Sequence, residues 1–237
     1  MVALNAWDWE GSTVTFGPIA HILVENVKSN INELRILPGQ KVFPDGSKVD
    51  CDIKDCIFEN ITGVYTFKLY CQPNITNAIE GTDDTSGTVG TISNLFFKNI
   101  TFDAVQNAGF SNIPVGSLFE VCADCDGLYF EDISVEETQE KFAEKGLRFM
   151  NVGPLSATWK TNSSEDPAHW GEIFSPDAVC TVDHVEIKNL KFQSQKEQPD
   201  ADSLVHAVRL SINEDYPNTT PKGGTGCGIV KEVKIID

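Results

Sequence analysis

Apolar and polar residues alternate in short segments that recur along the chain, and each segment closes with an Asn or an Asp. The clearest copy is ISNLFFKNI at 92–100. Five further copies lie at 19–27, 53–61, 126–133, 182–190 and 230–237. The shared amide or carboxylate positions are Asn26, Asn60, Asn99, Asp132, Asn189 and Asp237. Alternation rich in Val, Ile and Phe predicts half-buried β-strands.

The recurring amide position distinguishes two all-β architectures. An ordinary β-sandwich also has alternating strands, and alternation alone does not exclude it. In a solenoid of stacked parallel strands, however, Asn side chains at equivalent positions hydrogen-bond from one coil to the next. Because the amide recurs at the same place in each copy, we expect an all-β fold of the parallel β-helix type.

A second short strand is expected after each of these segments. These strands are predicted at 34–37, 67–70, 119–122, 147–150 and 208–211, and residues 2–5 look like the same element of a preceding coil. Stacking them predicts an outward column of Ala3, Arg35, Lys68, Glu120, Arg148 and Arg209. The next column is predicted to contain Asn5, Leu37, Tyr70, Cys122, Met150 and Ser211. The first column is either a mostly basic binding wall or a solvated face whose long side chains pair with Glu120 and its neighbours.

The solenoid is predicted to carry long loop insertions and one short helix. Residues 72–91 are polar and rich in Gly, Thr and Asp, which is typical of a loop. Residues 136–145 begin with acidic and end with basic residues before Gly146, which predicts a short helix. We expect one domain over 1–237. Neither end carries a recognisable cap, so we expect a fragment of a longer solenoid or end-to-end stacking of copies.

Composition narrows the classes of partner. The formal net charge of −17 argues against nucleic acid as a partner, and no apolar run reaches the length of a membrane span. Met1 leads directly into VALNAW, without an export signal. Localisation stays open, since a longer parent protein could be secreted.

Seven cysteines without paired spacing predict free thiols. This pattern is typical of a reducing compartment, or of a fold that does not need disulfides. Cys122 and Cys125 have metal-site spacing, but no second pair or neighbouring His completes a site. We predict neither a metal nor a cofactor.

The segment AWDWE at 6–10 carries the densest candidate chemistry. Trp7 and Trp9 are of the type that stacks on sugar rings, and Asp8 and Glu10 are of the type that does acid–base work in glycoside cleavage. The competing interpretation is that one indole covers the open end of the core while the two carboxylates are solvated turn residues.

VALNAWDWEG followed by FGPIAHILVENV resembles the polygalacturonase-like glycoside hydrolases, in the region after their paired aspartates. The resemblance implies a right-handed parallel β-helix that hydrolyses pectic and related polysaccharides with inversion. It places the aspartate pair before Met1, so this chain corresponds to a C-terminal portion. The family's Gly-His-Gly falls near 32–34, where the histidine is missing, and its Arg-x-Lys matches Lys68-Leu-Tyr70. Because Lys does not replace Arg conservatively at a carboxylate site, a neutral or differently decorated glycan is as plausible as galacturonan.

The leading hypothesis is a glycoside hydrolase acting on a plant-type polysaccharide or oligosaccharide. Its candidate acid and base are Asp8 and Glu10. Its candidate substrate contacts are Asn5, Trp7, Arg35, Lys68, Tyr70, Glu120 and Arg148. The alternatives are a non-catalytic glycan-binding β-helix and a structural or adhesive module, both favoured by the missing aspartate pair.

Overall fold

The structure, a computed structural model, describes residues 2–6, 16–42, 45–70, 90–103, 117–137, 148–153, 179–194, 206–210 and 227–237. Thirteen strands and no helix occur in these ranges. The strands are β1 (Val2–Asn5), β2 (Ile19–Ala20), β3 (Leu23–Leu37), β4 (Gly39–Val42), β5 (Lys48–Cys51), β6 (Ile53–Tyr70), β7 (Thr91–Asp103), β8 (Ser117–Cys122), β9 (Asp124–Glu137), β10 (Arg148–Val152), β11 (Val179–Ser194), β12 (His206–Leu210) and β13 (Cys227–Ile236).

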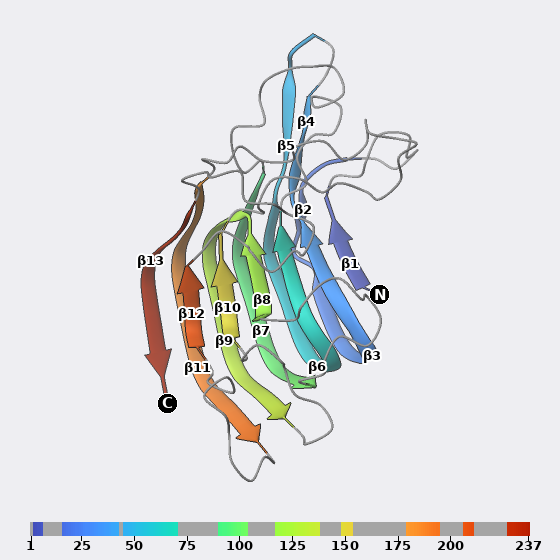
Figure 1. The fold of residues 1–237 in the computed structure, drawn as a ribbon. Coiled ribbons are helices and arrows are strands. Elements are labelled where there is room, and N and C mark those ends of the chain that lie inside the picture. Colours follow the sequence, from blue (N-terminus) through green and yellow to red (C-terminus); the bar gives the residue numbers. More distant parts are fainter. Residues whose placement is uncertain are drawn as a thin grey trace, which may run out of the picture.

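Eleven strands form one sheet that bends along its long strands into two wings (Figure 1). The first wing contains β2, the first parts of β3 and β6, and then β7, β9, β11 and β13. The second wing contains β1, the last parts of β3 and β6, and then β8, β10 and β12. Every strand pair in this sheet is parallel, whereas β4 and β5 form a separate antiparallel pair.

Successive strands from β7 to β13 alternate between the two wings. After each strand the chain therefore crosses to the other wing. When it returns to a wing, the new strand lies beside the previous strand of that wing. Parallel neighbours require such long connections, because a tight hairpin reverses the direction of the chain. The predicted all-β class with parallel strands is confirmed.

The hydrophobic core lies between the wings and is built around stacked phenylalanines. On the first wing Phe97 stacks between Phe58 and Phe130, with ring centroids 5.1 Å apart on both sides. On the second wing Phe67 stacks on Phe119, also at 5.1 Å. The two columns meet edge to face, and the Phe97 and Phe119 centroids are 5.0 Å apart. Both geometries are favourable for aromatic pairs, so these rings hold the wings together.

The residues that closed the sequence repeats lie at a bend of the first wing. Five of them have a left-handed backbone, with φ between 49° and 57°: Asn26, Asn60, Asn99, Asp132 and Asn189. Asn and Asp tolerate this conformation better than other side chains with a β-carbon. The bend is tightened at Gly63, where an added β-carbon would lie 2.2 Å from the carbonyl oxygen of Ser29. The recurring Asn or Asp therefore marks a bend within each of these long strands.

The prediction of a helix over 136–145 is wrong at its start. Glu136 and Glu137 are the last residues of β9, where they pair with Gln193 and Ser194 of β11. The parallel pairing of β9 and β11 thus continues through two residues for which the charge pattern indicated a helix. Residues 138–145 and most of the predicted insertion at 72–91 lie outside the described residues, apart from Gly90 and Thr91.

Candidate functional site

The outward face of the second wing carries a row of polar residues in register. Ala3 lies opposite Arg35, Arg35 opposite Lys68, and Lys68 opposite Glu120. This part of the predicted column is confirmed. The row continues through Asn151 on β10, and we call Arg35, Lys68, Glu120 and Asn151 the polar row.

Arg148 was predicted to continue this row, and that prediction is wrong. Met150 lies opposite Phe119, which places Asn151 opposite Glu120 and Arg148 opposite Ser117. The shift arises because Phe149 and Met150 are both fully buried. Two consecutive buried residues break the strict alternation on which the predicted register rested. Met150 is therefore also absent from the second predicted column.

The polar row is buried rather than solvated. Lys68 is 2% exposed, Glu120 is 7% exposed, and Asn151 is fully buried as well. Arg35 reaches solvent most, since 29% of its side chain is exposed. A charged residue is rarely buried unless it is paired, and partners account for the burial of Lys68.

Glu33 is the central partner and was not singled out from the sequence. It is 4% exposed, and its Oε2 lies 2.5 Å from the Nζ of Lys68. Its Oε1 accepts a hydrogen bond from Nε of Arg35 and pairs with the same guanidinium. The available signal was spacing: Glu33 stands two residues before Arg35 in β3, so both side chains project from the same face of the strand.

Burial and charge act in opposite directions on Glu33. Burial alone raises the pKa of the carboxyl, but the charges and hydrogen bonds of Lys68 and Arg35 lower it by more, so the pKa falls below 4.5. Glu33 therefore stays ionised at neutral pH. A carboxylate in this state fixes two cations in place, but it has no proton to give as a general acid.

Glu120 extends the network along the row. Its Oε2 accepts a hydrogen bond from Nδ2 of Asn151 at 3.3 Å, and both side chains are buried. Together Glu33, Arg35, Lys68 and Glu120 carry two positive and two negative formal charges. A compensated, hydrogen-bonded cluster is the form in which charges are tolerated in a protein interior.

The other predicted site residues lie beside this cluster or outside the described residues. Asn5 ends β1 opposite Leu37, and Tyr70 ends β6 opposite Cys122. Trp7, Asp8 and Glu10 lie outside the described residues. The residues that flank their segment are joined, since the backbone N–H of Gly17 donates to the carbonyl of Ala6 at 3.0 Å. Ala6 and Gly17 therefore lie side by side next to the end of β1.

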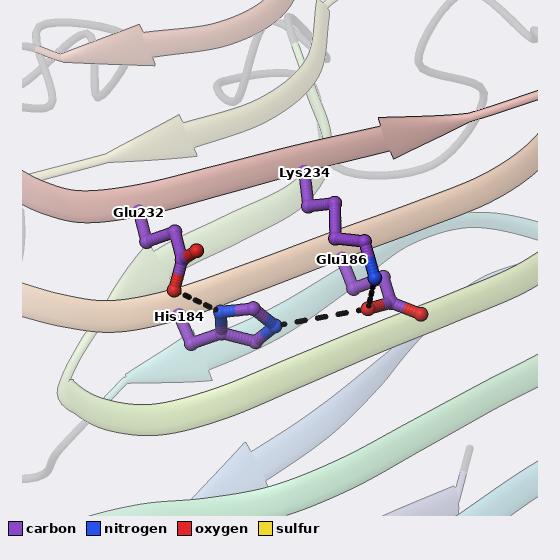
Figure 2. A network of polar contacts seen from close by, with 4 residues as sticks. All are labelled: His184, Glu186, Glu232 and Lys234. Carbon is purple, nitrogen blue, oxygen red and sulfur yellow. Dashed lines mark hydrogen bonds and ion pairs between the residues drawn. The ribbon is translucent and has the colours of Figure 1, made fainter.

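A second polar cluster lies on the outward face of the first wing (Figure 2). His184 Nδ1 lies 2.9 Å from Oε2 of Glu232, and Lys234 Nζ donates to Oε2 of Glu186 at 3.1 Å. The imidazole also lies against the ring of Tyr129, which stacks on Phe96 with centroids 4.7 Å apart. The polar contacts join β11 to β13, and the aromatic contacts join β11 to β9 and β9 to β7. We assign this cluster to strand attachment.

No group of three or more His, Cys, Asp or Glu residues with metal-binding geometry occurs among the described residues. The described part of the chain also has no helix long and apolar enough to cross a membrane. Comparison of the chain with protein-family models, curated proteins and solved structures found no match. The functional argument therefore rests on the residues themselves.

Proposed function

We propose that this chain is a right-handed parallel β-helix that acts on carbohydrate, as a glycoside hydrolase or a portion of one. Alternation of the strands between two parallel wings supports the solenoid, because each pair of successive strands then makes one coil. The resemblance of VALNAWDWEG and its flanking repeats to the polygalacturonase-like hydrolases supports the substrate class. A plant-type polysaccharide or oligosaccharide is the expected ligand.

The observation that carries the proposal is the cluster of Glu33, Arg35 and Lys68 on the outward face of the second wing. Burying ion pairs costs desolvation energy that apolar residues of similar size avoid. Such clusters are common where a protein must hold a cation in a fixed position for a ligand. Arg35, with its side chain 29% exposed, is the member that meets solvent. Its guanidinium donors suit sugar hydroxyls and carboxylates alike.

Each member of the network has a distinct part in this proposal. Arg35 contacts the sugar, while Glu33 fixes the orientation of its guanidinium. Lys68 keeps Glu33 ionised, and Glu120 and Asn151 continue the polar row along the next strands. Asp8 and Glu10 are the candidate acid and base, and Glu33, held in its ionised form, has no proton to give as the acid.

The test measures the release of reducing ends and glycan binding on the same preparation. The substrates are pectic polysaccharides, arabinan, galactan and fructan, and the variants are Arg35→Ala and the double variant Asp8→Asn/Glu10→Gln. We expect Arg35→Ala to weaken binding at least tenfold and the double variant to abolish cleavage while binding persists. Lys54→Ala is the matched control, since Lys54 is an exposed cation on the first wing. Cleavage that survives the double substitution contradicts the assignment of Asp8 and Glu10.

A second candidate is a glycan-binding β-helix without catalysis. It is favoured by the carboxylates of the described network, since Glu33 is paired with two cations and Glu120 accepts a hydrogen bond from Asn151. This candidate predicts saturable binding of the same glycans without new reducing ends. Absence of both binding and cleavage overturns the carbohydrate proposal and favours a structural or adhesive module.

A further inference from the structure

The core is open at the edge formed by β13. Val233 lies opposite Val185, and Ile235 lies opposite Ile187. Val185 and Ile187 are buried, whereas Val233 is 43% exposed and Ile235 is 60% exposed. These two side chains therefore continue an inward-facing row, and no strand among the described residues covers them. Exposed apolar rows of this kind mark interaction surfaces.

The opposite edge of the first wing is open in the same way. On β3, Val24 lies opposite Phe58 and Val27 lies opposite Ile61. Phe58 and Ile61 are fully buried, but Val24 and Val27 are only half-buried against the core. Both edges thus present apolar residues from the same inward-facing rows.

At each edge one wing extends one strand further than the other, and the wing that extends further is a different one at the two edges (Figure 1). At one edge β13 extends the first wing by one strand beyond β11, and at the other β1 extends the second wing beyond β3. If β13 of one copy lies beside β3 of another, β1 of that second copy comes to lie beside β12 of the first. The two half-turns then make one complete turn.

We propose that copies of this chain assemble end to end through these edges, with β13 of one copy adding as a parallel strand to β2 and β3 of the next. One alignment satisfies the contacts across the junction. Placing Asp237 opposite Asn26 brings Val233 opposite Ile22 and Ile235 opposite Val24. It also continues the Asn ladder, because Oδ1 of Asn26 accepts from Asn60 and its amide nitrogen can then donate to the next rung. That rung is the carboxylate of Asp237.

The charges near β13 do not oppose this contact. Lys231 pairs with Asp183 at 2.7 Å, Glu232 pairs with His184, and Lys234 pairs with Glu186 (Figure 2). Edge strands often avoid association through unpaired charges, but here each of these charges has a partner on β11. The overall charge of −17 does repel a second copy. Salt screens that repulsion, so the assembly should strengthen as the ionic strength rises.

The contact is heterologous, because it joins two different edges. A heterologous contact that does not close into a ring extends into a linear assembly. Sedimentation velocity of the wild-type chain over a hundredfold range of concentration tests this directly. We expect the weight-average mass to rise with concentration, and to rise further at 0.5 M salt, which is roughly three times physiological ionic strength. A wild-type chain that stays monomeric at every concentration overturns the proposal and leaves a different partner as the occupant.

Two variants separate end-to-end assembly from unspecific aggregation. The double variant Val233→Lys/Ile235→Lys blocks one edge, and Val24→Lys blocks the other. Each variant alone should be monomeric, but their equimolar mixture should form dimers and nothing larger, because each retains one intact edge. Val179→Lys is the control, since Val179 is 40% exposed on β11 and belongs to neither row; it should assemble like the wild type. Assembly that persists in both edge variants also overturns the proposal.

Discussion

Nδ2 of Asn99 donates a hydrogen bond to Oδ1 of Asn60 over 2.7 Å, although 39 residues separate the two along the chain. Asn60 in turn donates to Asn26 at 3.4 Å, and Asn189 donates to Asp132 at 3.0 Å. Because the same residues have left-handed backbones, each rung both turns the strand and joins it to its neighbour. These two roles, in the backbone bend and in hydrogen bonding, explain why only Asn and Asp occupy this position in the repeats.

Asn60→Ala should lower the free energy of unfolding by about 2 kcal/mol, because the hydrogen bonds are lost and Ala tolerates a left-handed backbone less well than Asn. Asn60→Gly loses the same hydrogen bonds but relieves the backbone, so its loss should be about 1 kcal/mol smaller than that of the Ala variant. Urea unfolding followed by circular dichroism measures both. Equal losses in the two variants would show that the backbone conformation contributes nothing.

Lys68→Met should destabilise the chain strongly, because it removes one of the two cations that contact the buried Glu33 carboxylate in the described structure. Breaking a buried ion pair from one side costs about 3 to 5 kcal/mol, and Lys68 and Glu33 are both almost fully buried. Adding Glu33→Gln removes the uncompensated charge, so the double variant should regain part of the loss. A double-mutant cycle by chemical denaturation measures the coupling. Additive losses contradict the direct interaction.

The fold was largely predictable because its signal is repeated. The alternation of apolar and polar residues predicted the strands. The closing amide of each copy, such as Asn60 and Asn99, marks the bend that the long strands share. The second wing was less predictable, since its strands are short and carry no such marker. The predicted register of this wing is confirmed from Arg35 to Glu120. It is wrong at Arg148, where the consecutive buried residues Phe149 and Met150 shift the pairing.

The site was less predictable than the fold, because burial on the outward face depends on tertiary context. Lys68 was expected to point away from the core, and its partner Glu33 lies on the neighbouring strand, β3. Residue type and spacing put Glu33 on the face of Arg35, but they do not indicate that both carboxylate oxygens would be used. The hairpin of β4 and β5 left no comparable periodic signal, since its strands are only four residues each.

Cys56 should resist thiol reagents in the folded chain. Burial raises the pKa of its thiol, and its Sγ donates to the carbonyl of Lys54 at 3.2 Å. Since the thiolate is the reactive form, both effects protect it. Cys51, Cys125 and Cys180 are also buried, so they should behave alike. Alkylation with peptide mapping should label these four only after denaturation. If Cys56 is alkylated in the folded chain as fast as in the denatured chain, the result contradicts its burial.

The last prediction concerns acid stability and follows from the lowered pKa of Glu33. A carboxyl whose folded-state pKa lies below its unfolded value binds fewer protons when folded. Its contribution to stability is fully present above the unfolded pKa, near 4.5, and is lost as the pH falls through the folded-state pKa. The buried Lys68 and the partly exposed Arg35 then lose the negative charge of the carboxylate that both contact.

The wild type and Glu33→Gln should therefore differ in stability most above pH 4.5 and converge below it. Urea unfolding between neutral and acidic pH, with both proteins at the same ionic strength, gives the two curves. Asp126→Asn is the matched control, because Asp126 is an exposed carboxylate on β9; its curve should run parallel to the wild type. A constant gap between the wild type and Glu33→Gln at every pH would mean that Glu33 does not gain its stability from ionisation, and the ion-pair account of the polar row would fail.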